Sequence, residues 1–285
     1  MKTVSDGFKL ENGVMIPCVA LGTWESADGE QCYNSVLEAF KQGYTHIDTA
    51  KIYGNEVSVG KAIKDSGLRR ESLFITTKLW NTDRGSYDEA IQAFETSMNK
   101  LDLEYLDLYL IHWPNPEKYR DNWQHINAES WRAMEDLYLA GKIKAIGVSN
   151  FMINHLEELE KTARVKPMVN QIRLCPGDTK DELVKYCQDK NIILEAYSPF
   201  ARGEVFKIDE LKELAASKNK TISQVVLRWC LQKGFVSLPK SVTPSRIKEN
   251  TEIFDFELND AEISKIDKVQ TTYDSESNEP DTIDF

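Results

Sequence analysis

Four side chains that could carry acid–base chemistry follow short apolar runs of the sequence. Asp48 and Tyr53 lie in HIDTAKIYGNE, Lys78 lies near the end of LFITTKLW, and His112 lies near the end of LDLYLIHW. A phenol has an ordinary pKa of about 10 and is a poor proton donor at neutral pH, but a neighbouring ammonium stabilises its phenolate. A carboxylate would hold that ammonium in place, and a neutral imidazole could donate a hydrogen bond to a developing oxyanion. These residue types suit hydride addition to a carbonyl carbon with protonation of its oxygen.

A simpler interpretation of HIDTAKIYGNE is a solvated loop, because Gly54 and Asn55 are turn residues and Lys51 is at home in water. A lone lysine or histidine at a strand end is also more often structural than catalytic. Four such groups at one rim are different, because burying them would be costly unless they paired with one another or with a ligand. His46 shares the strand face of Asp48 but lies deeper, so we interpret it as a core residue.

The elements that must position these residues are eight short apolar runs that alternate with stretches of helical period. The runs are CVALGT, THIDTA, LFITTKLW, LDLYLIHW, KAIGVSN, MVNQIRL, IILEAYSP and FVSLPKS. Helices are expected near 30–42, 55–66, 87–101, 125–140, 152–162, 179–189 and 207–232, with a short helix beginning near Pro244. Strands alternating with helices imply parallel pairing through crossovers, and eight such units close most naturally into a (β/α)8 TIM barrel. We therefore expect one barrel domain over residues 1–285.

A doubly wound open sheet is the main alternative fold. It would normally carry GxGxxG after its first strand, and VALGTW contains no such motif. In a β/α barrel the active site lies at the carboxyl ends of the strands, where the four candidate side chains would meet.

The two ends of the chain carry further signals. FKLENGVMIP alternates around Asn12-Gly13, which predicts an N-terminal hairpin with a two-residue turn. The last sixteen residues, QTTYDSESNEPDTIDF, are acidic and predict an extended C-terminal tail near the barrel mouth, or a frayed end. His125 and His155 fall on expected outer helices and should be solvated.

Composition limits the partners of this chain of 285 residues. Its formal net charge of -11 argues against binding to nucleic acid or anionic lipid, which need clustered cations. No apolar run approaches the roughly 20 residues of a membrane span, and no signal-peptide core follows the first residues. The five cysteines lack CxxC or metal-ligand spacing, so we expect reduced thiols, no metal site and a cytoplasmic location. The expected partner is a small molecule; we expect a monomer, with a weak homo-oligomer as the alternative.

Several motifs together resemble one enzyme family. GTW at 22–24, IDTAKIYGNE, TKLW, LIHWP, GKIKAIGVSNF, NQI, AYSPF and LPKSVTPSRIKEN stand in the order and at the spacing of the aldo-keto reductases, NADPH-dependent (β/α)8-barrel oxidoreductases. The chain is most similar to the bacterial and protist branch that includes 2,5-diketo-D-gluconate reductases and prostaglandin F synthases. The resemblance implies reduction of aldehydes and ketones by the tetrad Asp48, Tyr53, Lys78 and His112, with Tyr53 as general acid. Lys51 is then a bystander.

The resemblance also implies an NADPH site. Ser149, Asn150 and Gln171 would hold the nicotinamide amide, whose donors and acceptors match theirs, and Tyr197 would stack beneath the ring. The implied cofactor set is Thr23, Trp24, Ser149, Asn150, Gln171, Tyr197, Ser198, Lys240, Ser241, Val242, Thr243, Arg246, Glu249 and Asn250. Within it Lys240, Ser241, Thr243 and Arg246 would hold the 2′-phosphate, and Glu249 and Asn250 the adenine. Trp24, Trp80 and Trp113 would line the cleft for the carbonyl substrate.

Two other functions remain open. A family member can bind NADPH without catalysis, as a regulatory or structural protein, although the intact tetrad argues against this. Lys78 could instead form a Schiff base, as strand-end lysines do in barrel aldolases, but the complete nicotinamide set argues against that.

Overall fold

Strands and helices alternate along the chain in the computed structural model of the protein, which describes residues 1–271 and 279–285. The strands are β1 (Gly7–Lys9), β2 (Met15–Pro17), β3 (Ala20–Gly22), β4 (His46–Asp48), β5 (Phe74–Leu79), β6 (Leu106–Ile111), β7 (Ile143–Ser149), β8 (Val169–Arg173), β9 (Ile193–Tyr197) and β10 (Val236–Leu238). The α-helices are α1 (Glu30–Lys41), α2 (Glu56–Asp65), α3 (Tyr87–Leu101), α4 (Trp123–Leu139), α5 (Ile153–Glu160), α6 (Asp181–Asp189), α7 (Asp209–Lys218), α8 (Ile222–Gln232), α9 (Pro244–Glu249) and α10 (Asp260–Asp267). Short 3-10 helices are η1 (Lys51–Tyr53), η2 (Arg70–Ser72), η3 (Asn81–Asp83), η4 (Glu117–Asn122) and η5 (Ala201–Lys207).

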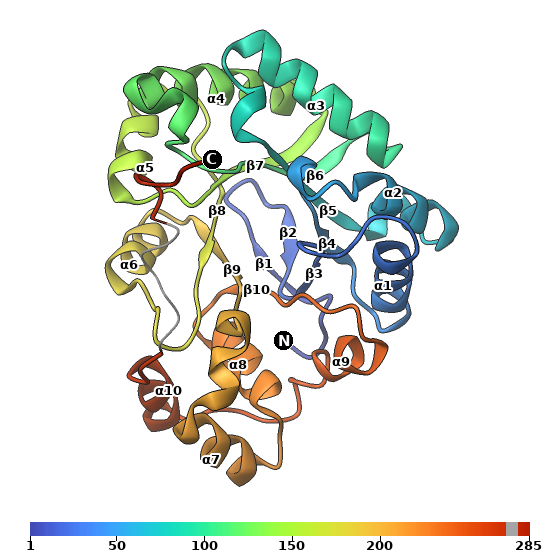
Figure 1. Cartoon of the computed structure of the whole chain (residues 1–285), viewed down its shortest axis with the longest axis vertical. Coiled ribbons are helices and arrows are strands. Elements are labelled where there is room, and N and C mark those ends of the chain that lie inside the picture. The colour runs from blue at the N-terminus through green and yellow to red at the C-terminus, as the bar shows by residue number, and fades with distance from the viewer. Residues whose placement is uncertain (272–278) are drawn as a thin grey trace.

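Strands β3 to β10 form one parallel sheet in sequence order, with the helices arranged around it (Figure 1). Parallel bridges from Val19 to Ser237 and from Gly22 to Lys240 bring the first and last strands together. The predicted (β/α)8 barrel is therefore confirmed, and all eight apolar runs are strands. No helix among the described residues is long and apolar enough to cross a membrane.

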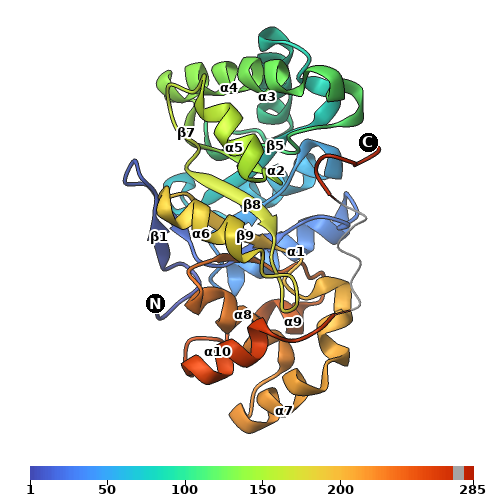
Figure 2. The same ribbon diagram turned by 90° about the vertical axis from the view of Figure 1, so that its left-hand side faces the viewer.

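Two clusters of buried apolar side chains stabilise this barrel. One fills its interior and includes Phe74, Leu108 and Leu110 together with Leu10 and Ile16 from the N-terminal segment. The other lies between the strands and the helices. The β1–β2 hairpin covers one end of the barrel, and the C-terminus lies at the opposite end (Figure 2). Because apolar side chains plug the hairpin end, polar side chains inside the barrel gather at the other end.

The N-terminal hairpin is present, but the two-residue turn predicted for it is wrong. Leu10 N donates to Val14 O at 2.8 Å, so three residues, 11–13, form the loop. Gly13 has a φ of 90°, whereas Asn12 does not take the positive φ that a two-residue type I′ turn requires.

The predicted helix at 207–232 is two helices, α7 and α8. Asn219 ends α7 in the left-handed conformation, with φ 52°. Thr221 then caps the start of α8 with a capping box. The Thr221 side chain accepts a hydrogen bond from Gln224 N, and the Gln224 side chain accepts one from Thr221 N. Asn259 and Glu262 form the same motif at the start of α10, a helix that the sequence analysis missed. In both places the capping residues mark the start of a helix that apolar periodicity alone does not show.

Close packing inside the barrel gives a test of the fold. A Cβ added at Gly147, in β7, would lie 2.6 Å from Val169 O and 2.8 Å from Leu110 Cδ2. We expect Gly147→Ala to lower the free energy of unfolding by roughly 1–3 kcal/mol, the usual cost of overpacking, as measured by urea denaturation. Gly234→Ala is the comparison, since its Cβ would have open space and the cost there is that of the left-handed φ of 83° alone. An equal or smaller loss for Gly147→Ala would contradict the packing described.

Candidate active site

The four predicted catalytic residues meet at the carboxyl ends of three neighbouring strands. Asp48 ends β4, Lys78 lies near the end of β5, His112 follows β6, and η1 places Tyr53 beside them. Lys78 Nζ donates to Asp48 Oδ1 at 2.7 Å and to Thr49 O at 2.9 Å, and lies 3.3 Å from the Tyr53 hydroxyl oxygen. One ammonium thus joins the carboxylate to the phenol.

Burial and neighbouring charges together set the protonation states of Lys78 and Tyr53. Burial alone would lower the pKa of Lys78, but Asp48 and Tyr53 outweigh it and raise that pKa above its ordinary value. Burial raises the pKa of Tyr53, and the charge of Lys78 opposes this rise. The prediction that a nearby ammonium brings the Tyr53 pKa down is correct for the effect of Lys78 alone but wrong for the net pKa, because burial has the larger effect. Lys78 is charged and Tyr53 is protonated at neutral pH.

His112 is held as a neutral imidazole. Burial first, and then the charge of Lys78, lower its pKa well below the ordinary value. Its ring lies edge-on to Tyr53, with centroids 5.8 Å apart, and edge-on to Trp80 at 5.1 Å. A neutral imidazole next to the phenol can offer a hydrogen bond without adding charge.

The loops around the tetrad are braced by hydrogen bonds among buried polar groups. Thr23, just after β3, donates to Asp48 O from both its backbone nitrogen and its hydroxyl, each at 3.0 Å. Asn55 donates to Thr23 O at 2.9 Å and accepts from Thr49 Oγ1 at 2.8 Å. Thr23 therefore supports Asp48, in addition to lying beside the predicted cofactor cleft. Lys51 pairs with Asp83, which is not a member of the tetrad.

The predicted nicotinamide residues form one connected cluster. Ser149 Oγ donates to Gln171 O at 2.8 Å, and Asn150 Nδ2 donates to His112 O at 3.0 Å. Tyr197, half-buried at the end of β9, donates to Asn150 Oδ1 at 2.8 Å. Asn150, with φ 62°, and Ser198, with φ 48°, take left-handed backbone conformations, which Asn tolerates better than Ser.

The hydrogen bonds of Gln171 leave its side-chain carbonyl oxygen available to a ligand. Its amide nitrogen donates to Asp48 Oδ2 at 2.8 Å and to Glu195 Oε2 at 2.9 Å. With both hydrogens engaged, the Gln171 carbonyl oxygen is the atom left to accept a hydrogen bond. An amide ligand such as nicotinamide carries the matching donor, so the cluster fits the group that the sequence predicted.

The segment after β10 presents exposed cations. Lys240 and Arg246 are exposed and form no salt bridge with any residue in 1–271 or 279–285. Ser241 is buried and accepts from Thr243 N at 3.1 Å, while Val242 is half-buried. These free cations suit an anion such as a phosphate.

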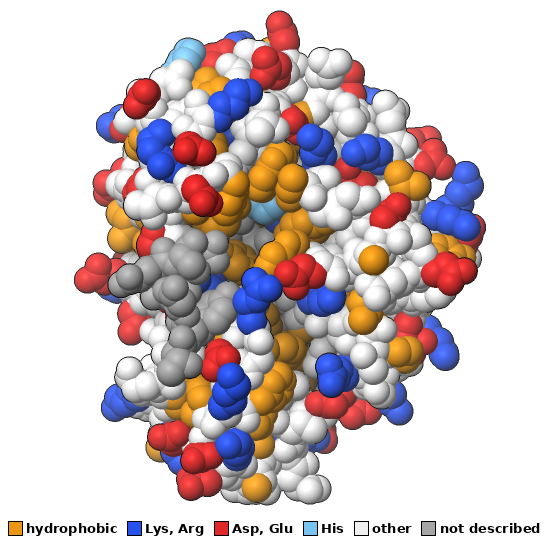
Figure 3. Space-filling view, in the orientation of Figure 1, with side chains coloured by type: hydrophobic (Ala, Val, Ile, Leu, Met, Phe, Trp, Pro, Cys, Tyr) orange, Lys and Arg blue, Asp and Glu red, His pale blue; other side chains and the backbone are white. Residues whose placement is uncertain are grey.

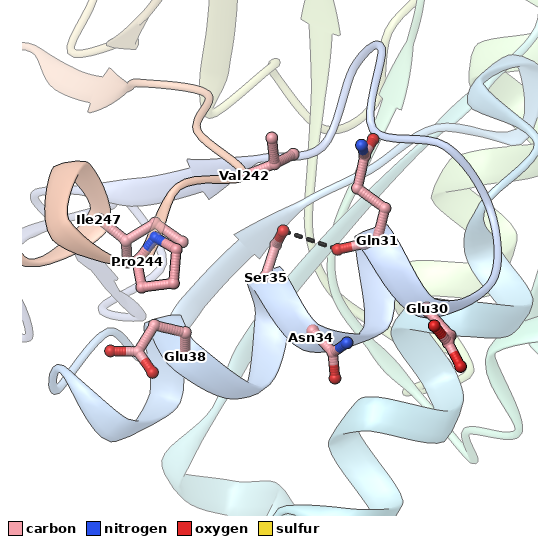
Figure 4. Close-up of a pocket in the computed structure, with 8 residues that line it drawn as sticks. All are labelled: Glu30, Gln31, Asn34, Ser35, Glu38, Val242, Pro244 and Ile247. Atoms are coloured by element: carbon pink, nitrogen blue, oxygen red, sulfur yellow. Dashed lines mark hydrogen bonds between the residues drawn. The ribbon is translucent and has the colours of Figure 1, made fainter.

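The two residues predicted to contact the adenine are less accessible to a ligand than Lys240 and Arg246. Glu249 accepts from Thr221 Oγ1 at 2.6 Å, and Asn250 is buried. Next to this segment, a pocket between α1 and residues 242–247 is lined by Glu30 and Glu38 as well as by apolar side chains (Figure 4). Its two carboxylates would repel a phosphate, so this pocket does not suit the predicted 2′-phosphate.

The three predicted cleft tryptophans differ in exposure. Trp24 is 43% exposed and lies under the Arg202 guanidinium, 4.9 Å from the ring, and Arg202 also pairs with Glu25 at 3.0 Å. Trp80 is half-buried and Trp113 is buried. Figure 3 shows a hollow in this face of the molecule, with hydrophobic side chains around it and a histidine at its floor.

Comparison with known proteins agrees with this geometry. The model of the aldo/keto reductase family matches residues 19–271. The chain belongs to the aldo/keto reductase family. It is 50% identical to a glyoxal reductase of Bacillus subtilis over 93% of each chain, and 44% identical to a 9,11-endoperoxide prostaglandin H2 reductase of Trypanosoma cruzi over 91% of this chain and 90% of that one. A Bombyx mori aldo-keto reductase solved in complex with NADP superposes with a TM-score of 0.84 at 35% identity, over 92% of each chain.

The C-terminal segment of this aldo/keto reductase reaches the site. Phe285 stacks on Trp80, with centroids 5.9 Å apart and planes at 12°, and meets Trp113 edge-on at 5.4 Å. Asn81 donates to Phe285 O at 3.3 Å, and Arg120 donates to Ile283 O. The prediction of a tail at the barrel mouth is confirmed for residues 279–285, while 272–278, including Tyr273, lie outside the described residues.

Asp281 anchors this segment, and it explains why the prediction of a solvated His155 is wrong. His155 has no exposed surface, and its Nε2 lies 2.9 Å from Asp281 Oδ1. Asn115 donates to the same oxygen at 2.8 Å. A residue far along the chain thus covers the face of α5 that the local periodicity assigned to solvent. His125, by contrast, is exposed as predicted.

Sequence reasoning missed several residues that shape the site, namely Glu25, Glu195, Arg202, Asp281 and Phe285. One signal was available for Glu195, a single acid inside the apolar run IILEAYSP. The apolar residues of TIDF could have indicated that the end of the chain docks on the barrel. The pairing of Arg202 with Glu25 depends on two loops far apart in sequence and left no local signal.

Phe285 gives a test of the cleft. Removing its ring should raise the KM for aldehydes with an aromatic ring by about threefold to tenfold, the value of one aromatic contact, and should leave the KM for a two-carbon dicarbonyl compound unchanged. Steady-state kinetics of Phe285→Ala across a series of substrate sizes would measure this. Asp284→Ala is the control, because Asp284 is exposed on the same segment. A uniform change across the series would show that Phe285 does not contact substrate.

Proposed function

We propose that this chain is an NADPH-dependent reductase of aldehydes and ketones whose catalytic groups are Asp48, Tyr53, Lys78 and His112. The observation that carries the proposal is the fully buried Lys78 ammonium, placed between the Asp48 carboxylate and the Tyr53 hydroxyl. The bound cofactor would supply the hydride. The chain supplies the proton and the electrostatic setting.

Tyr53 acts as the general acid in this proposal. Its pKa is raised by burial, so the hydroxyl keeps its proton until a substrate oxygen gains negative charge. Lys78 then stabilises the phenolate that remains, and Asp48 keeps Lys78 charged and in position. Neutral His112 donates a hydrogen bond to the same carbonyl oxygen and orients it toward Tyr53.

Cofactor binding follows from the two clusters described above. Gln171, with Ser149 and Asn150, would receive the nicotinamide amide, and Tyr197 would pack against the ring. Lys240 and Arg246 would hold the 2′-phosphate that distinguishes NADPH from NADH.

Small carbonyl compounds are the substrates we propose. The rings of Trp80, Trp113 and Phe285 contact one another at the cleft and give it an aromatic wall for the carbonyl compound. The 50% identity to a protein named glyoxal reductase supports small dicarbonyl compounds in particular. We further propose that residues 1–285 act as one domain, as a monomer in the cytoplasm. The five cysteines support a reducing compartment because all are free and buried.

The aldolase alternative is disfavoured by the state of Lys78. A Schiff-base lysine must be a neutral amine to attack a carbonyl, and such lysines have a lowered pKa. Here the Asp48 carboxylate raises the pKa of Lys78, so its nitrogen is protonated and already engaged.

Replacing the proton donor tests the proposed mechanism. Tyr53→Phe removes one hydroxyl, so NADPH binding should persist while kcat falls by about 100-fold or more, the usual contribution of general acid catalysis. Lys78→Met should be similarly inactive, because an uncharged neighbour cannot stabilise the phenolate. Stopped-flow single-turnover rates and fluorescence titration of NADPH would separate chemistry from binding. Retention of more than a tenth of wild-type kcat by Tyr53→Phe would mean that another residue donates the proton.

Cofactor preference tests the cationic segment. Arg246→Ala, alone and with Lys240→Met, should raise the Kd for NADPH stepwise, by about tenfold to 100-fold per contact, and leave the Kd for NADH nearly unchanged. High salt should shrink the difference, because exposed charges are screened. Fluorescence titration of both cofactors against the three proteins measures it. Equal weakening for NADH would place these side chains on another part of the cofactor, or on the fold.

A further inference from the structure

A second carboxyl group lies beneath the tetrad, inside the barrel. Glu195, in β9, has no exposed surface, and its Oε2 accepts from the Gln171 amide nitrogen that also donates to Asp48. A single amide nitrogen therefore bridges two carboxyl groups, 2.9 Å from one and 2.8 Å from the other. The proposed mechanism assigns no role to Glu195.

The surroundings of Glu195 offer little to neutralise a charge. From β4, His46 Nε2 lies 3.8 Å from Glu195 Oε1, but burial lowers the pKa of His46 to about 3 and keeps its ring neutral. That Glu195 oxygen has no hydrogen-bond partner among residues 1–271 and 279–285. From β10, the cross-strand neighbour is the apolar Val236.

Lys78, on β5, is the one ammonium near this pair of carboxyl groups within the described part of the chain, and it is engaged with Asp48 at 2.7 Å. If both carboxyl groups were ionised, the buried cluster would carry a net negative charge in a region of low dielectric constant, which is costly. If Glu195 holds a proton, the cluster is neutral. Two acids sharing a site in this way separate into one that ionises and one that does not.

We propose that Glu195 is a positioning residue of this active site: as an uncharged acid it accepts the second hydrogen of the Gln171 amide, which fixes the Gln171 carbonyl as the end offered to the cofactor and leaves Asp48 as the sole anion beside Lys78. This inference rests on the proposed function, because it assigns Gln171 to the nicotinamide amide. Burial first, and then the charge of Asp48, raise the pKa of Glu195 to about 8, in keeping with its uncharged state at neutral pH.

Ionisation of Glu195 would act on the reaction through Lys78 and Tyr53. A second anion near Lys78 opposes the build-up of a phenolate on Tyr53, so carbonyl reduction should slow as pH rises through the Glu195 pKa. Glu195→Gln keeps an acceptor for the Gln171 amide and cannot ionise. Glu195→Met has similar bulk but no acceptor. Glu56→Gln is the matched control, because Glu56 is also buried but bonds to Thr77 and lies near Lys100 instead of Lys78.

Stability without cofactor gives the first readout. The ordinary glutamate value of 4.5 describes the unfolded chain, and the folded value is about 8. Between these pH values the folded protein holds a proton that the unfolded chain has released, so this group lowers stability as pH rises from about 4.5 to about 8, with no further change above. The Tm of Glu195→Gln minus that of wild type should therefore increase through this window and then level off. Glu56→Gln should not reproduce that pH profile.

Kinetics and cofactor binding give the second readout. Single-turnover reduction by wild type should decline above pH 8 by at least threefold more than reduction by Glu195→Gln, while the two agree near pH 6.5. Glu195→Met should raise the Kd for NADPH about twofold to tenfold, the value of one hydrogen bond, and Glu195→Gln should restore it.

The outcomes separate the two proposals. If wild type fails to reduce any of a panel of carbonyl compounds with NADPH, the proposed function is wrong, and the stability profile still reports on Glu195. If wild type is active but Glu195→Gln has the wild-type pH profile in both stability and rate, Glu195 does not set the charge of the cluster. A loss of Tm in Glu195→Met with wild-type cofactor binding would show a purely structural role.

Discussion

The buried ion pair between Lys78 and Asp48 is the interaction on which the rest of the site depends. An ammonium with no exposed surface is tolerated when a carboxylate and further acceptors surround it, and Asp48 and Thr49 O provide them at 2.7 and 2.9 Å. The pair requires β4 and β5 to be in one register, in which Asp48 faces Thr76, two residues before Lys78. A slip of one residue would turn one partner out of the barrel, so the pair and the sheet specify each other.

Exclusion of water then sets the protonation states of Tyr53 and His112. The apolar interior core, with Leu10 and Ile16 of the N-terminal segment, plugs the barrel beneath the polar layer. In the resulting low dielectric, burial raises the pKa of Tyr53 and lowers that of His112, so the phenol stays protonated and the imidazole neutral. Both are the states that donate hydrogen bonds to a carbonyl oxygen. The same desolvation that makes the site costly to build therefore prepares it for reduction.

The sequence sufficed for the barrel and for the meeting of Asp48, Lys78 and His112, because both follow from local patterns combined with one topological rule. Apolar runs separated by helical periods place strand ends at one rim, so Asp48, Lys78 and His112 had to converge. Contacts between distant segments could not be predicted in this way. His155 looked solvated because nothing on α5 reveals that Asp281 will cover it. The hydrogen bond from Gln171 to Glu195 depends on the pairing of β8 with β9, which no local pattern specifies. The break between α7 and α8 was local and was readable from the capping residues.

Charged groups are neutralised in the buried layer of the barrel mouth but not at its exposed rim. The difference follows from the dielectric environment of each place. In the buried layer around Lys78, the protein itself must neutralise every ion. Lys78 is therefore paired with Asp48, and the further carboxyl group of Glu195 keeps its proton. At the rim, water stabilises a lone cation, so Lys240 and Arg246 can stay without a salt bridge to any described residue. Because the chain has a net charge of -11, an approaching phosphate is repelled by most of the surface and attracted where cations are not already neutralised. A salt bridge at Arg246 would cancel that attraction, just as a missing partner for Lys78 would destabilise the barrel.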